Sequence, residues 1–138
     1  MTSARDTRNE LVGLGRELRK AIPGVYAGYA QLHAAAMGED GALPGRIKEL
    51  IALAIAVTKE CDGCVAAHAR AAAERGATAP EVAEAMGVTI LMNGGPGTVW
   101  GPRGYAAFAE FAGGTASGAR AKPPAAGQAP DAVRRPGS

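Results

Sequence analysis

Residues 46–68 read RIKELIALAIAVTKECDGCVAAH and form the most informative segment of the chain. Residues 50–57 are apolar on every side, a pattern that fits either a fully buried helix or a buried strand. The length of the run, its alanines, and the helix-forming residues Lys48 and Glu49 before it favour the helix. The sequence therefore predicts a buried helix over residues 46–60, followed by a break at the cysteine pair.

Helical patterns continue after this segment. An alanine-rich helix is expected over residues 64–75, ended by Gly76. Residues 78–81 (TAPE) match a capping box with proline in the first turn, and three apolar residues follow at helical spacing: Val82, Met86 and Ile90. A glycine-rich turn over residues 93–97, which would allow helices to approach closely, then precedes a last helix over residues 103–112.

Two further helices are expected before the central segment, over residues 3–21 and 23–37. Ser3 or Thr2 can cap the first, and a Gly-, Asp- and Pro-containing loop over residues 38–45 separates the second from the central segment. The aromatic content of only 4% suits closely packed helices better than a sandwich of strands. We therefore predict an all-α fold, a compact bundle of about six helices.

Charge is unevenly distributed along the 138 residues, whose net charge is +2. Residues 113–138 hold four basic residues and one acidic residue, so the rest of the chain holds 11 basic and 12 acidic residues. The basic balance thus belongs to an Ala-, Gly- and Pro-rich tail and gives no sign of a nucleic-acid-binding face. We predict a helical domain over residues 1–112 and a disordered tail over residues 113–138, because the tail has too few large apolar residues to offset its ordering entropy.

The amino-terminal ten residues are polar and charged, unlike a signal peptide. The longest uncharged stretch in the middle of the chain, residues 50–58, is far shorter than the ~20 residues of a membrane-spanning helix. The sequence thus predicts a cytoplasmic protein with no membrane partner. In a reducing compartment, two cysteines three positions apart indicate catalysis or metal binding more than a structural staple.

The chemistry of the chain centres on Cys61 and Cys64, which form a C-x-x-C motif at the start of a predicted helix. Unpaired N–H groups and the positive end of the helix dipole stabilise a thiolate there, and the spacing lets a disulfide close with little backbone movement. His68 follows Cys64 by four residues, so both share one helix face and the imidazole can accept the thiol proton. Glu49 is a carboxylate in an apolar segment, where it needs a partner such as a histidine N–H.

Other readings of these residues remain open. The cysteines could be buried structural thiols, or they could bind zinc with His68 and Glu49, although the usual second pair of Cys or His ligands is missing. Haem attachment is excluded, because it needs a histidine directly after the second cysteine and Val65 stands there. We predict no metal or cofactor. Outside this motif we expect structural roles for His33, Trp100, Tyr105 and Phe108.

Four stretches together resemble the alkylhydroperoxidase D-like / carboxymuconolactone decarboxylase family. They are KELIALA at residues 48–54, CDGCVAAH at 61–68, GAT at 76–78 and ILMNGGP at 90–96. The resemblance covers residues 43–111 and implies an all-helical fold and assembly as trimers or hexamers. It also implies that Cys64 forms the sulfenic acid, that Cys61 is its proton donor and resolving thiol, and that His68 and Glu49 form the proton relay.

The resemblance has one departure and leaves one geometric question. Well-studied members carry a further histidine at the position of Gly63, which bears on the choice of reductant. In a simple helical hairpin Glu49 would lie ~18 Å from the turn and His68 ~10 Å. Contact between them would therefore need a crossing angle, an offset or a bridging water.

The leading functional expectation is a thiol-dependent peroxidase, with peroxiredoxin-type activity, or a disulfide oxidoreductase. Its partners would be a small-molecule peroxide and a thiol or disulfide reductant, and its apolar helices predict a homo-oligomer. One alternative is a carboxymuconolactone decarboxylase-type lactone enzyme, because a shared fold can host different chemistry. Another is a non-enzymatic helical oligomer that binds a partner through its basic tail.

Overall fold

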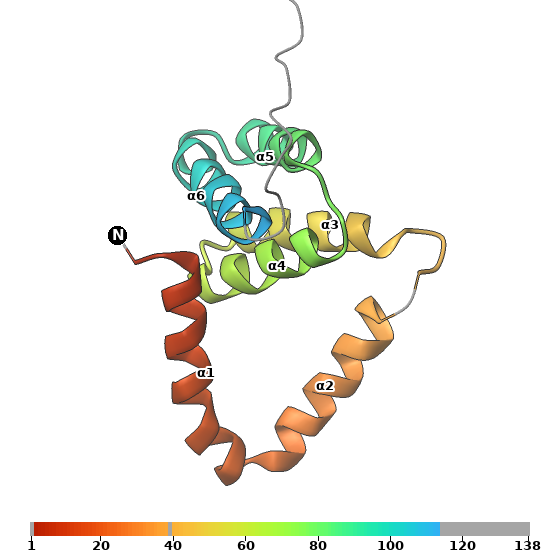
Figure 1. Cartoon of the computed structure of the whole chain (residues 1–138), viewed down its shortest axis with the longest axis vertical. Coiled ribbons are helices and arrows are strands. Elements are labelled where there is room, and N and C mark those ends of the chain that lie inside the picture. The colour runs from red at the N-terminus through yellow and green to blue at the C-terminus, as the bar shows by residue number, and fades with distance from the viewer. Residues whose placement is uncertain (1, 39, 114–138) are drawn as a thin grey trace, which may run out of the picture.

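Six α-helices make up the part of the chain that the computed structural model describes, residues 2–38 and 40–113 (Figure 1). The predicted all-helical fold is confirmed. The predicted tail lies outside the described residues from residue 114 onward. The helices are α1 (Ala4–Ala21), α2 (Pro23–Met37), α3 (Gly45–Thr58), α4 (Asp62–Glu74), α5 (Ala79–Asn93) and α6 (Gly95–Ala112).

Short polar side chains begin three of these helices. Ser3 caps α1, because its hydroxyl oxygen accepts a hydrogen bond from the Asp6 backbone N–H at 3.1 Å. The predicted capping box of α5 is present. The Thr78 hydroxyl oxygen accepts a hydrogen bond from the Glu81 backbone N–H, and the Glu81 carboxylate accepts one from the Thr78 backbone N–H. Cys61 caps α4 with its sulfur. Each cap satisfies backbone donors that a helix leaves without intrahelical partners.

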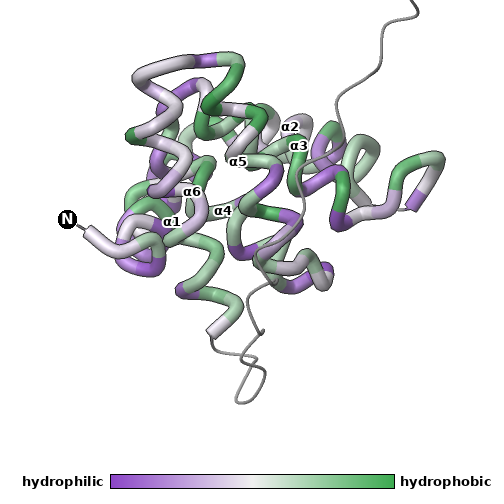
Figure 2. Tube along the Cα trace, turned by 90° about the horizontal axis from the view of Figure 1, so that it is seen from above, coloured by the Kyte–Doolittle hydropathy of each residue, from purple (hydrophilic) through white to green (hydrophobic). Residues whose placement is uncertain are grey.

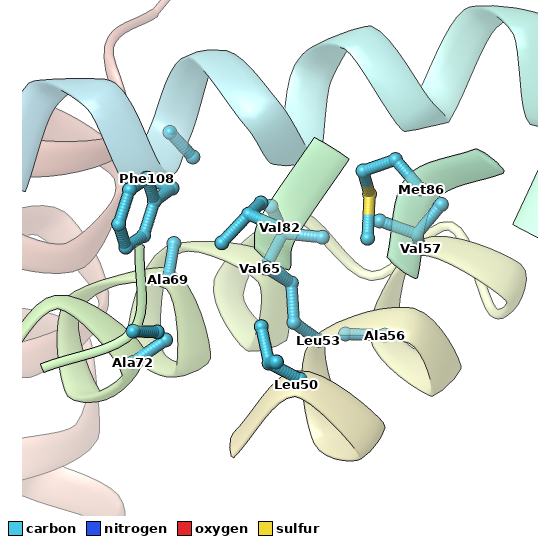
Figure 3. Close-up of a cluster of buried hydrophobic side chains, with 12 residues drawn as sticks. Leu50, Leu53, Ala56, Val57, Val65, Ala69, Ala72, Val82, Met86 and Phe108 are labelled. Atoms are coloured by element: carbon cyan, nitrogen blue, oxygen red, sulfur yellow. The ribbon is translucent and has the colours of Figure 1, made fainter. Parts of the chain in front are cut away.

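The hydrophobic core is formed by α3, α4, α5 and α6 (Figure 3). Leu53 and Val82 are fully buried, and Val57, Met86 and Phe108 are nearly so. Alanines of α3 and α4 fill the spaces between these larger side chains, which lets the two helices pack closely. The predicted helix over this apolar run is confirmed, but its predicted burial on every side is wrong. Leu53 and Val57 face the core, whereas Ile51 and Ile55 on the other side are 46% and 51% exposed.

The last helix is longer than the sequence predicted. We expected a turn over residues 93–97 and a helix from Arg103, whereas α6 begins at Gly95 and the turn reduces to Gly94, with φ of 65°. The glycines that were expected to interrupt the helix lie within its first turn, where they let α6 pack closely against α5. A Cβ on Gly97 would come within 2.8 Å of the Ile90 Cα atom, so this close contact between the two backbones requires glycine there.

Helices α1 and α2 extend away from the core and meet in a V (Figure 1). Neither helix contains a buried residue, although α1 packs along α4 through its first half. In Figure 2 hydrophobic positions are spread along the coloured part of the trace, these two helices included. Within residues 2–38 and 40–113, no helix is both long and apolar enough to cross a membrane.

Candidate functional site

The two cysteines lie where α3 turns into α4. Lys59 and Glu60 form the turn, and Glu60 takes the left-handed conformation with φ of 53°. Cys61 and Cys64 form a disulfide bond, with their Cα atoms 5.2 Å apart. The Cys61 sulfur also accepts a hydrogen bond from the Cys64 backbone N–H at 3.3 Å. Cys61 is half-buried and Cys64 is exposed.

His68 lies one turn beyond Cys64 on α4 and reaches the carboxylate of Glu49 on α3. The His68 Nδ1 atom is 2.8 Å from the Glu49 Oε2 atom, so the contact is direct and needs no bridging water. Glu49 is only 1% exposed, whereas the His68 side chain is 23% exposed. When Glu49 is ionised, Nδ1 donates to the carboxylate and Nε2 keeps a lone pair that can accept a proton.

Helix positions explain why these two side chains meet. Glu49 stands nine residues before the end of α3, or ~14 Å along its axis. His68 stands six residues after the start of α4, or ~9 Å, and the two side chains span the remaining offset. The distances of ~18 Å and ~10 Å expected from the sequence are longer because they start at Cys61 and leave out the length of the two side chains.

Arg75 is a residue of the site that sequence reasoning missed. It caps the carboxyl end of α4, and its Nε atom lies 3.7 Å from the Glu49 Oε1 atom. The two oxygens of one buried carboxylate thus face two different nitrogen groups of α4. The available signal was spacing: Arg75 follows His68 by seven residues, which places both on one face of an α-helix.

Gly45 makes room for this arginine. It is buried at the start of α3, four residues before Glu49, and a Cβ there would overlap the Arg75 Nη1 atom. The Gly45 backbone N–H donates to the Asp40 Oδ1 atom at 2.6 Å. Arg46, Asp40 and Arg75 line a polar cavity of about 540 Å³ at this end of α3.

Gly63, inside the C-x-x-C motif, faces α1. A Cβ at this position would come within 2.5 Å of the Leu11 Cδ1 atom. Leu11 therefore occupies the space beside the cysteine turn that a larger residue at position 63 would need.

A second cavity, of about 270 Å³, adjoins the same turn between α1, α4 and α6. Asp62 and Val65 of α4 line one side of it. Trp100 and Arg103 of α6 line another, with the guanidinium 4.6 Å from the centre of the indole ring. Trp100 is thus partly exposed beside a cavity, whereas Phe108 lies in the core as expected.

No group of three or more His, Cys, Asp or Glu side chains among residues 2–38 and 40–113 is placed to hold a metal ion. The sulfurs that would have served a zinc site are bonded to each other. The geometry gives instead a dithiol–disulfide pair, an imidazole one turn away, and a buried carboxylate behind the imidazole.

Comparisons with known proteins bear on the family and the fold of the chain. The model of the carboxymuconolactone decarboxylase family matches residues 23–101. An uncharacterized protein of Cupriavidus necator is 37% identical over 106 residues, covering 75% of this chain and 93% of that protein. An uncharacterized protein of Haemophilus influenzae is 46% identical over 56 residues, covering 41% of this chain and 49% of that protein.

One solved structure has the same fold. It is a crystal structure of a carboxymuconolactone decarboxylase family protein from Legionella pneumophila, in its apo form, with a TM-score of 0.75 and 34% sequence identity. The match covers 79% of this chain and 96% of that one. The similarity therefore extends over most of both chains.

Proposed function

The chain belongs to the carboxymuconolactone decarboxylase family, and on that basis we propose that it is a thiol-dependent peroxidase that cycles Cys61 and Cys64 between dithiol and disulfide. The observation that carries the proposal is the pairing of an exposed Cys64, bonded to Cys61, with the His68–Glu49 hydrogen bond one turn along the same helix. A structural disulfide has no need of a half-exposed histidine backed by a buried carboxylate.

The reaction begins from the reduced pair. His68, held by Glu49, accepts the proton of the Cys64 thiol, and the thiolate attacks one oxygen of the peroxide. The O–O bond breaks, the distal oxygen stays on sulfur as sulfenic acid, and the other oxygen leaves as an alcohol or water after taking up a proton. The peroxide is reduced by two electrons and the sulfur is oxidised by two.

The second half-reaction closes the disulfide. The Cys61 thiolate attacks the Cys64 sulfur, the S–O bond breaks, and the departing hydroxide takes up the proton that the Cys61 thiol gave up and leaves as water. An external dithiol, itself oxidised to a disulfide, then restores both thiols by thiol–disulfide exchange. The exposed Cys64 is the accessible sulfur for that exchange, and a reducing cytoplasm would supply the electrons.

Rapid-mixing experiments test this cycle. Reduced wild-type protein should consume one equivalent of hydrogen peroxide and end as the Cys61–Cys64 disulfide, detected by mass spectrometry. Cys61→Ser should still consume peroxide once and should hold a sulfenic acid that dimedone traps, whereas Cys64→Ser should do neither. Equal peroxide consumption by the wild type and Cys64→Ser would refute the proposal.

The family description also names a lactone decarboxylase, and the same protein can be tested for that reaction. Such chemistry needs a proton donor and a group that binds a carboxylate, and it does not need a dithiol. Alkylation of both cysteines separates the two functions. Lactone turnover that survives alkylation would favour the decarboxylase. The peroxidase proposal expects alkylation to abolish peroxide turnover.

We further propose that the protein works as a homo-oligomer, through the apolar faces of α1 and α2. Leu14, Val25 and Tyr29 are 65%, 65% and 66% exposed. Large apolar side chains are thus in contact with water on two helices that contain no buried residue. Light scattering coupled to size-exclusion chromatography should give a mass that is a multiple of 13.9 kDa. Leu14→Glu combined with Val25→Glu should lower that mass, and a monomeric wild type would contradict the proposal.

A further inference from the structure

We infer that Arg75 is a positioning residue of the site: its fixed charge faces one oxygen of the buried Glu49 carboxylate and keeps the other oxygen turned toward His68 throughout the redox cycle. The inference rests on the proposed function for its catalytic consequence, but its structural part can be tested without peroxide. It adds to the cysteines, histidine and glutamate a fifth residue, which belongs to none of the sequence motifs.

The geometry gives each oxygen of Glu49 its own partner. Oε2 lies 2.8 Å from His68 Nδ1, and Oε1 lies 3.7 Å from Arg75 Nε. The second distance is longer than a hydrogen bond and marks a charge contact. Measured from the start of α4, His68 lies ~9 Å and Arg75 ~20 Å along that helix. Glu49 lies ~14 Å before the end of α3, at a level between them.

Burial explains why the carboxylate needs this partner. Glu49 is 1% exposed, and a carboxylate removed from water keeps its charge only when an opposite charge or several donors compensate it. His68 supplies a positive charge only while it holds a second proton, and a relay must give that proton up. Arg75 remains protonated in both states, so the charge on Glu49 is balanced when His68 is neutral.

The surroundings of Arg75 favour this placement. Its side chain is 31% exposed, so the guanidinium lies at the edge of the polar cavity and its hydrocarbon stem passes Gly45. The lack of a side chain at Gly45 leaves the space that Arg75 Nη1 uses. Asp40, which accepts a hydrogen bond from the Gly45 N–H, and Arg46 are further charged residues that line this cavity.

Nuclear magnetic resonance of the reduced protein tests the structural part. The chain contains two histidines, so His68→Gln assigns the low-field proton resonance of the Nδ1–H group bonded to Glu49. We expect this resonance in the wild type and in Arg75→Lys, and we expect it to move upfield or vanish in Arg75→Gln. The matched control is Arg70→Gln, which removes an arginine of the same helix that pairs with Glu74 instead.

A double-mutant cycle tests the catalytic part. Arg75→Gln should lower kcat/KM for hydrogen peroxide about tenfold, a fraction of the effect of a fully buried charge because Arg75 is partly exposed. Arg75→Lys should keep most of the wild-type kcat/KM, because it retains the positive charge. In a Glu49→Gln background the same substitution should change nothing further, because there is no carboxylate left to hold.

Gly45→Ala provides a variant that keeps the arginine. Its Cβ displaces the guanidinium, so it should shift the Nδ1–H resonance in the same direction as Arg75→Gln while thermal unfolding monitors the fold. An unchanged resonance in Arg75→Gln, or equal losses of kcat/KM with and without Glu49, would overturn the inference. A wild type inactive toward peroxide would refute the proposed function alone, since the resonance would still report on Arg75.

Discussion

Glu49 and His68 stand nineteen residues apart in the chain, yet their Oε2 and Nδ1 atoms lie 2.8 Å apart across the α3–α4 interface. The carboxylate is almost completely buried and the imidazole is partly open to solvent. This pair links the apolar core to the exposed Cys64 sulfur, because His68 and Cys64 share a face of α4.

Glu49→Gln is expected to lower kcat/KM for peroxide by about 100-fold, at the low end of the range for loss of general acid–base catalysis. The amide is neutral and cannot stabilise a protonated His68. His68→Gln should cause a loss of similar size, and the double variant should be no worse than either, because the two side chains act as one unit. Peroxide consumption followed by stopped flow measures all three, and additive losses would show that the residues act separately.

Gly63→His should destabilise the protein by about 1 kcal/mol, as overpacking of a contact does. The new side chain needs the space of the Leu11 Cδ1 atom, which lies 2.5 Å from the Cβ position. Leu11→Ala should relieve much of this cost when both changes are combined. Urea unfolding of the two single variants and the double variant measures the coupling, and purely additive costs would mean that Leu11 does not limit position 63.

Gly104→Ala should destabilise the core by about 1–3 kcal/mol, the usual cost of forcing extra atoms into a packed interior. The added methyl group would lie 2.8 Å from Val57 Cγ2 and 2.9 Å from Met86 Sδ. Gly101→Ala on the same helix is the matched control, because its nearest neighbour lies at 3.5 Å. Thermal unfolding should show that control equal to or more stable than the wild type, since alanine favours helix.

The capping box of α5 should make stability depend on pH through Glu81. The hydrogen bond from the Thr78 backbone N–H, helped by the Arg46 guanidinium, lowers the pKa of the Glu81 carboxyl in the folded protein. Because the pKa of Glu81 is lower in the folded protein, its carboxylate contributes to the free energy of unfolding. This contribution is fully present above the unfolded-state pKa and is lost as the pH falls through the folded-state pKa.

Urea unfolding of the wild type and Glu81→Gln from pH 7 to pH 3 checks this dependence. The wild type should be the more stable at pH 7, and the difference should shrink as the solution is acidified. Arg46→Gln removes one of the groups that lower the pKa of Glu81. In an Arg46→Gln background, the difference in unfolding free energy between Glu81 and Glu81→Gln should therefore be smaller. A difference that stays constant with pH would contradict the assignment.

Local signals in the sequence predicted most helix boundaries well. Ser3, Pro23 and the Thr78–Glu81 box begin helices where expected, because capping depends on side chains that bond to their own neighbouring backbone. The start of α6 was wrong by eight residues. Glycine and proline there read as breakers, but the close contact of Gly97 with α5 favours a helix that local propensity alone would not give.

The sequence by itself determined the helical class, the cysteine turn, and the placement of His68 on the face of Cys64, because each depends on residues within one or two turns of each other. Tertiary structure alone decided that Glu49 meets His68 directly, that Arg75 faces the other carboxylate oxygen, and that α1 and α2 contain no buried residue. These features depend on how separate helices pack against one another. Such packing is set by side-chain volumes and burial across the whole core, which no single stretch of the chain contains.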